Sequence, residues 1–314
     1  MKIFINKLIS VFLTLFLVSI MIFLVFQVLP GNPAEIILGV EADEAQIEKL
    51  EKELGLDKPM PTRYVEWIKG LARLDMGKSI KYGVNVKDLF AKRFPITLFL
   101  TLYSLALTIV IGIPLGIWIA SKDSTWYGQF ASWITQLGIS IPSFWLAFML
   151  INIFALKLNW FPTFGYNAMG GSFLDKLHKF FLPSLAISFS NIATVVRYLK
   201  SSILDQIRRD YVRTARVKGL KINKILYRHV LRNALIPVIT ILGIILTSSI
   251  GGSIIIENVF ALPGIGSLIV QSVSSRDFPL IQSVVVVIAA MVIFINFIID
   301  ICYRIIDPRI RGGE

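Results

Sequence analysis

The hydrophobic positions of this chain form long uninterrupted runs, separated by shorter polar segments. A membrane-spanning helix needs about 20 mostly apolar residues, because the hydrocarbon core is about 30 Å thick and a helix rises about 1.5 Å per residue. Six segments meet this requirement and predict an all-α, polytopic membrane protein with six transmembrane helices: residues 8–29, 95–120, 133–156, 181–200, 236–256 and 281–305.

The composition agrees with a bilayer as the surrounding solvent. Hydrophobic residues make up 55% of the 314 residues and charged residues 17%, against about 25% charged in a soluble domain. The first apolar run follows Lys2 and Lys7, exceeds the 7–15 residues of a signal peptide and lacks a small-residue cleavage site. We therefore expect residues 1–29 to be a retained first transmembrane helix.

The fourth apolar segment is the most polar of the six. It contains Pro183, Ser184, Ser188, Ser190 and Asn191. Polar groups are costly against lipid, so we expect this helix to face other helices or a water-filled path.

Lys and Arg are distributed unevenly among the loops, which predicts the orientation. With the N-terminus in the cytoplasm, the cytoplasmic pieces contain seventeen basic residues and the two short outer loops four. The segment 30–94 has eleven basic and eleven acidic residues, and segments of that length cross the membrane regardless of charge. Both termini are therefore expected in the cytoplasm, and the net charge of +12 requires no nucleic acid partner.

The segment 30–94 is expected to fold as a small external helical subdomain. Residues 43–56 and 62–74 each have an apolar face at helical spacing, and Gly55 is placed to end the first helix. Two interpretations remain open: a cap that only packs on the first transmembrane helix, or a docking surface or lid.

The predicted transmembrane helices contain almost no ionisable residues in their interiors. Ion-coupled carriers usually place such residues there as relays. The chain also lacks a GxxxxGK[ST] phosphate loop, and we expect no catalytic residue, metal ligand or cofactor in it. Energy then comes from another subunit, or the chain is a passive channel; an intramembrane enzyme would need reactive groups at bilayer depth.

The cytoplasmic loop at 201–235 is the most informative segment. Ile203, Leu204, Ile207, Tyr211 and Ala215 recur at helical spacing. Asp210 is expected to cap a short helix that ends at Gly219. A second helix follows, with an apolar face and a basic stripe, and Pro237 is expected to open the fifth transmembrane helix; the stripe consists of Lys221, Lys224, Arg228 and Arg232.

Two interpretations of this loop also remain open. The basic residues can anchor the loop to anionic lipid. Alternatively, two short helices joined at a glycine form a lever that a soluble partner grips.

The loop resembles the cytoplasmic coupling loop of ABC importer permeases, in the dipeptide, oligopeptide and nickel branch of the binding-protein-dependent systems. The likeness lies in Asp210-Tyr211-Val212-Arg213-Thr214-Ala215-Arg216-Val217-Lys218-Gly219-Leu220. Most such permeases begin the motif with Glu-Ala-Ala; here Arg213 and Thr214 replace the first two positions, while Ala215 and Gly219 keep the spacing. Further matches are Pro142-Ser143-Phe144-Trp145, Gly251-Gly252-Ser253, Glu257-Asn258-Val259-Phe260 and Arg276-Asp277-Phe278-Pro279.

The resemblance implies a type I, MetI-like permease fold with a transmembrane core at 95–305 and a cytoplasmic tail at 306–314. It also implies a second, homologous permease subunit, two ATPase subunits that bind ATP and Mg, an extracytoplasmic binding protein, and a bacterial or archaeal cytoplasmic membrane. The ATPase-coupling residues would be Asp210, Tyr211, Arg213, Thr214, Ala215, Arg216, Lys218 and Gly219.

Two further groups of residues are candidates for roles in transport. The pore wall, or plain helix packing, would use Pro142, Pro183, Gly243, Ser249, Gly251 and Gly252, with the prolines as kinks. External docking, or mere solvation of the loop ends, would use Glu257, Asn258, Arg276 and Asp277. Peptides are the expected substrate, with nickel or a metal chelate as the alternative.

Overall fold

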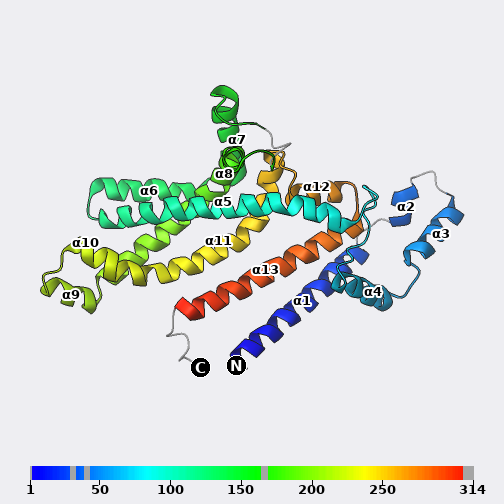
Figure 1. Ribbon diagram of the computed structural model, residues 1–314, viewed down its shortest axis with the longest axis horizontal. Helices are drawn as coiled ribbons and strands as arrows, with labels where there is room; N and C mark the ends of the chain where they lie inside the picture. The colour runs from blue at the N-terminus through cyan, green and yellow to red at the C-terminus, as the bar shows by residue number, and fades with distance from the viewer. Residues whose placement is uncertain (1, 29–32, 39–42, 164–168, 307–314) are drawn as a thin grey trace. The chain divides into compact units, whose positions relative to one another are not determined.

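The computed structural model describes residues 2–28, 33–38, 43–163 and 169–306, and these residues form helices and connecting turns with no named strand. The tail at 307–314 lies outside the described residues. The chain divides into two compact units (Figure 1): Met1–Pro95 with Gly264–Phe297, and Ile96–Pro263 with Ile298–Glu314.

The first unit contains the N-terminal helices and the apolar helices near the C-terminal end. Helix α4 packs on α1 through aromatic rings, with centroids 5.4 Å apart for Phe23 and Tyr64 and 5.9 Å apart for Phe23 and Trp67. The unit comprises α1 (Lys2–Val28), α2 (Pro33–Leu38), α3 (Glu44–Leu54), α4 (Met60–Ala72), the start of α5 (Val86–Ser121), α12 (Ile265–Ser274) and most of α13 (Phe278–Ile306).

The two predicted external helices are present. Helix α3 ends at Gly55, whose φ of 68° allows the N–H of Leu56 to reach the carbonyl of Glu51. Helix α4 begins after Pro59, slightly earlier than expected, because proline fits the position before a helix. The contact of α4 with α1 agrees with the interpretation of the 30–94 segment as a cap that packs on the first transmembrane helix.

Helix α5 begins at Val86 and continues through Pro95, so the helix starts before the apolar segment predicted at 95–120. The cause is tertiary, because Val86, Leu89 and Phe90 pack with α12 and α13 in one apolar cluster. The sequence analysis also missed α12, which begins directly after Gly264.

The second unit contains the remaining helices around α8. Helix α8 passes through Pro183 without a break and buries Ser184 and Ser188, which agrees with a helix that faces other helices. The unit comprises the rest of α5, α6 (Trp126–Ser140), α7 (Ser143–Leu150) with a π-helical segment (Ile151–Lys157), α8 (Phe173–Ile207), α9 (Asp210–Val217), α10 (Ile222–Ile225) with a second π-helical segment (Leu226–Val230), and α11 (Leu231–Val259).

The third predicted transmembrane helix is two helices rather than one. Helix α6 and the segment Ser143–Lys157 meet at 101°, whereas five other helices are each long and apolar enough to cross a membrane. Ile141 adopts an extended conformation (φ −82°, ψ 119°), as residues before proline usually do, and Pro142 starts the next helix. Pro142 therefore breaks the helix outright, beyond the expected kink.

Helices α5 and α8 cross at two glycines. A Cβ atom at Gly112 would lie 3.2 Å from the side chain of Val195, and one at Gly116 would lie 3.0 Å from Leu199. Glycines spaced by four residues form one face of a helix and allow close approach of a neighbour. The sequence analysis did not use this pair, although its GxxxG spacing was visible.

Candidate functional site

Helix α9 is fastened to the second unit by its apolar side. Val212 and Ala215 are buried, and they pack with Ile203, Ile225 and Val230 from α8, α10 and the π-helical segment that follows α10. Residues 212 and 215 lie one turn apart, so they share a face. The predicted short helix is confirmed, but its buried face is centred on Val212, which the sequence analysis had not placed there.

The C-terminal end of α9 is closed by a glycine. Gly219 has φ 78°, and its N–H donates to the carbonyl of Arg216 (2.9 Å) while the N–H of Leu220 donates to Ala215 (3.3 Å). This is a Schellman motif, and it needs a left-handed residue that glycine adopts without strain. The predicted end at Gly219 is confirmed.

Asp210 does not cap α9, contrary to the prediction. Arg209 occupies the N-cap position without a side-chain bond, and Asp210 is the first helical residue. The Asp210 carboxylate lies 3.9 Å from the Arg213 guanidinium in an exposed ion pair. An aspartate in the first turn still favours the helix dipole, so its contribution is electrostatic.

Tyr211 connects α9 to both neighbouring helices. Its hydroxyl donates to the Gln206 side chain at the end of α8 (2.9 Å) and accepts from the Asn233 amide of α11 (3.4 Å). Tyr211 is 37% exposed, although the helical spacing groups it with apolar residues such as Ile203. The hydroxyl stays near solvent because its hydrogen-bond partners lie at the surface.

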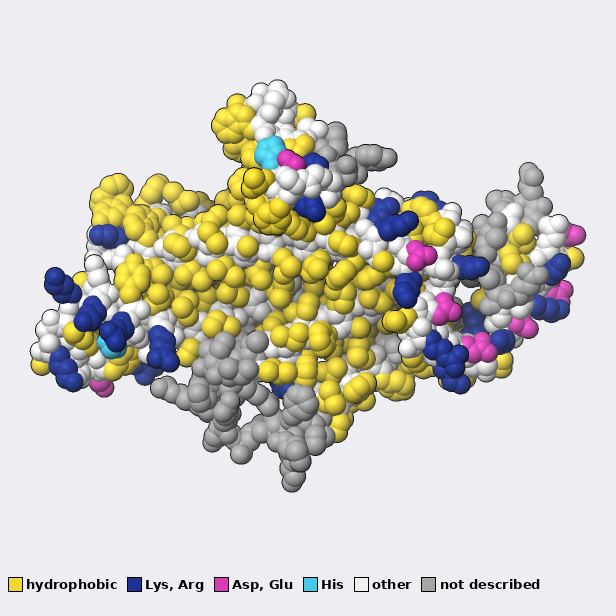
Figure 2. Space-filling view, in the orientation of Figure 1, with side chains coloured by type: hydrophobic (Ala, Val, Ile, Leu, Met, Phe, Trp, Pro, Cys, Tyr) yellow, Lys and Arg dark blue, Asp and Glu magenta, His cyan; other side chains and the backbone are white. Residues whose placement is uncertain are grey.

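The outer face of α9 is exposed and basic. Arg213, Thr214, Arg216 and Lys218 are exposed, and Val217 presents an apolar side chain with 89% of its area exposed. The predicted basic stripe is also exposed: Lys221, Lys224, Arg228 and Arg232. Figure 2 shows the Lys and Arg side chains gathered around α9 and α10, while hydrophobic side chains cover α5 and α11.

The second helix predicted in the loop at 201–235, α10, is continuous with the fifth predicted transmembrane helix, α11. Residues Ile222–Val259 form one helical run that includes the π-helical segment Leu226–Val230. Pro237 lies inside α11 and does not open it, which corrects the prediction. Helix α10 is thus joined to α11 without a break in the helical backbone.

The candidate pore residues fall into two groups. Gly243 and Ser249 are buried in α11, and the Asn191 amide of α8 lies 3.5 Å from the Ser249 hydroxyl. Gly251 and Gly252 are exposed, and a Cβ atom at either position would meet nothing within 4 Å. Among the residues that the structure describes, none therefore approaches these two glycines closely.

Two of the four external docking candidates are fully buried. The carboxylate of Glu257 accepts a hydrogen bond from Thr97 (2.6 Å). Asp277 accepts from Ser79 and from the backbone N–H groups of Ile80 (3.2 Å) and Lys81 (3.1 Å). Glu257 and Asp277 therefore organise the fold in this structure and are not available for docking.

The other two external candidates are exposed. Asn258 and Arg276 both present their side chains at the surface, and Arg276 has a positive φ of 52°. They remain compatible with docking.

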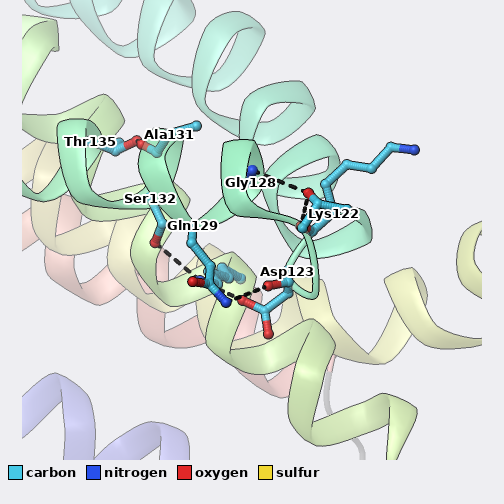
Figure 3. A network of polar contacts seen from close by, with 9 residues as sticks. Lys122, Asp123, Gly128, Gln129, Ala131, Ser132 and Thr135 are labelled. Atoms are coloured by element: carbon cyan, nitrogen blue, oxygen red, sulfur yellow. Dashed lines mark hydrogen bonds and ion pairs between the residues drawn. The ribbon is translucent and has the colours of Figure 1, made fainter.

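A polar network joins α8 to the connection between α5 and α6 (Figure 3). The Lys200 ammonium lies 2.7 Å from the Asp123 carboxylate and donates to the Ser132 hydroxyl (3.1 Å). Thr125 caps α6 by accepting from the N–H of Gly128. The sequence analysis did not identify this network because its members are distant in the chain.

Two family profiles match successive parts of the chain. The binding-protein-dependent transport system inner membrane component matches residues 112–312, and the N-terminal membrane component of the same systems matches residues 1–101. The chain belongs to this family. It is a permease subunit of the binding-protein-dependent ABC importers, as the motifs around α9 indicated.

Curated relatives align with nearly the whole chain. The oligopeptide transport system permease protein AppB of Bacillus subtilis is 37% identical over 297 residues, 94% of each chain. The glutathione transport system permease protein GsiC of Escherichia coli is 38% identical over 307 residues, 98% of each chain. Among solved structures, an inward-facing methionine ABC transporter (MetNI) matches with a TM-score of 0.58 and 19% identity over 70% of this chain and 96% of that one, which shows the fold.

Proposed function

We propose that this permease forms one half of the pore of a peptide importer and receives force from an ATPase subunit through α9. The observation that best supports this proposal is the way in which α9 is attached to its neighbours. Its buried Val212 and Ala215 and the bridging Tyr211 fasten it to α8 and α11, while its outer face is exposed. A short helix held in this way moves with the helices to which it is joined.

The proposed assembly contains a second homologous permease, two ATPase subunits and an extracytoplasmic binding protein. The support is the family, whose description names a binding-protein-dependent system. ATP and Mg would bind at the ATPase partners. ATP binding shifts the pore between states only if the ATPase pair binds the two states with different affinity.

The proposed orientation places both termini and α9 in the cytoplasm of a bacterial or archaeal cell, with the pore in the cytoplasmic membrane. The support is the distribution of Lys and Arg. The test uses single cysteines at Arg213 and Lys78 in a Cys302→Ser background, each treated with an impermeant maleimide. Arg213→Cys should react only in inverted vesicles and Lys78→Cys only in intact cells; the reverse pattern would exclude this orientation.

The coupling role is tested by capture of the ATPase subunits. Val217→Asp places a charge at an exposed apolar side chain of α9 without disturbing the core. We expect it to weaken co-purification of the ATPase by about tenfold or more, because a charge would be buried at the contact. The matched control, Val65→Asp on α4, should leave co-purification unchanged; equal capture by both variants would exclude α9 as the contact.

Peptides are the proposed substrate. The support is the peptide and glutathione systems to which the full-length relatives belong. Uptake of labelled dipeptide and of nickel by a deletion strain carrying the permease operon decides between them. Dipeptide uptake that depends on this permease supports the proposal, and permease-dependent nickel uptake alone would reject it.

A further inference from the structure

A cavity of about 240 Å³ lies between α6 and α8 in the second unit. A single water molecule needs a cavity of about 10–15 Å³, so this cavity has room for a larger polar group. Its polar wall consists of Ser132, Thr135 and Gln136 from α6 and of Arg197, Lys200 and Ser201 from α8.

The cavity carries one net positive charge. The ammonium of Lys200 is balanced by the Asp123 carboxylate at 2.7 Å. The Arg197 guanidinium lies over the Tyr198 ring, 5.3 Å from its centroid, and among the residues that the structure describes it has no hydrogen-bond or ion-pair partner. Arg197 is exposed, and its side chain and the neighbouring hydroxyl groups line an open space that suits a compact oxyanion.

Helix α6, which forms one wall of the cavity, also carries exposed aromatic side chains. Trp126 and Trp133 of α6 are 78% and 74% exposed, and Tyr127 lies next to Trp126. Tryptophan and tyrosine gather at the level of lipid headgroups. Farther along the same helix Leu137 is also 65% exposed.

We propose that this cavity binds the phosphodiester of an anionic phospholipid in the cytoplasmic leaflet. Arg197 binds the phosphate, Ser132 and Thr135 bind its oxygens or the glycerol, and an acyl chain follows Trp133 and Leu137. A headgroup with one net negative charge matches the single unbalanced positive charge. The proposal rests on the orientation proposed above, which the cysteine labelling tests separately.

The experiment measures lipid retention by the full-length permease in detergent, using phosphatidylglycerol and phosphatidylcholine as probes and native mass spectrometry as the readout. The wild type should retain one phosphatidylglycerol in preference to phosphatidylcholine. Arg197→Gln should weaken this retention by at least about tenfold, because a charged hydrogen bond is lost. The control Arg208→Gln removes an exposed charge outside the cavity and should retain the lipid.

A second variant distinguishes a loss of lipid binding from misfolding of the permease. Thr135→Val keeps the shape of the side chain and all charges, and it should weaken retention by a smaller factor. Equal retention by the wild type and both cavity variants would overturn the proposal. Displacement of the lipid by inorganic phosphate or by a dipeptide would also overturn it, because the site would then bind a free anion.

Discussion

The buried carboxylate of Asp277 accepts a hydrogen bond from the hydroxyl of Ser79, which lies 198 positions earlier in the chain. The same carboxylate receives the backbone N–H groups of Ile80 and Lys81 and that of Leu280 in the first turn of α13. One side chain therefore fixes the loop before α5 and the start of α13. This arrangement explains why an aspartate in the turn between α12 and α13 is fully buried.

Asp277→Ala should destabilise the permease by on the order of 2–3 kcal/mol. The reason is that several buried donors lose their acceptor at once. Unfolding in a mixed-detergent titration measures the loss, and limited proteolysis should show earlier cleavage between residues 77 and 85. Asp57→Asn, at an exposed position, is the control and should behave like the wild type.

Gly219→Ala should destabilise α9 by about 1–2 kcal/mol, because alanine is strained at a φ of 78°. Gly219→Asn should cost less, since asparagine tolerates the left-handed conformation better. Open space surrounds the position, so the effect comes from the backbone and not from a clash. The rate of amide hydrogen exchange in α9 measures this loss of stability.

The control for Gly219 is Gly252→Ala, at another open glycine that lies inside helix α11. It should leave exchange in α9 unchanged. If Gly219→Ala and Gly219→Asn exchanged at the wild-type rate, the Schellman motif would not be what closes this helix.

Tyr211→Phe should reduce the coupling of ATP hydrolysis to transport by about fivefold without preventing assembly. The change removes the hydroxyl that joins Gln206 and Asn233, and a hydrogen bond contributes about 1 kcal/mol. The ratio of ATP hydrolysed to peptide transported in proteoliposomes measures it. The control is Tyr227→Phe, whose ring is 60% exposed, and an unchanged ratio in Tyr211→Phe would show that the bridge plays no part in coupling.

Gly116→Val should destabilise the second unit by about 1–3 kcal/mol, because even a Cβ atom there lies 3.0 Å from Leu199. Gly251→Ala should be neutral in the isolated permease, since its surroundings are open. Unfolding midpoints in detergent test both. Equal midpoints for Gly116→Val and the wild type would mean that α5 and α8 separate at little cost.

Much of the helical framework follows from local sequence. Hydrophobic run length located the transmembrane helices α1, α5, α8, α11 and α13, and the spacing of apolar residues located α3, α4 and α9. Each of these signals acts within a few turns of helix. The ends were less predictable, and α5 is the clearest example: its first residues are helical because they pack on α12 and α13.

The candidate site was predicted in part. The exposure of Arg213 and Arg216 and the closure at Gly219 follow from residue type and backbone preference. The bridge through Tyr211 did not follow, because its partners come from two other helices. Glu257 was misjudged since a carboxylate near a helix end is usually exposed, whereas here it is buried and accepts a hydrogen bond from Thr97.

The sequence by itself determined that this chain crosses a membrane, where most of its long helices lie and which short helix carries the family motif, because bilayer thickness, helix periodicity and glycine geometry are local constraints. The tertiary structure alone decided how sharply the third predicted helix bends at Pro142, which glycines allow α5 and α8 to touch, and which acidic side chains are buried. These depend on contacts between residues far apart in the chain, and no local pattern encodes which distant groups will meet.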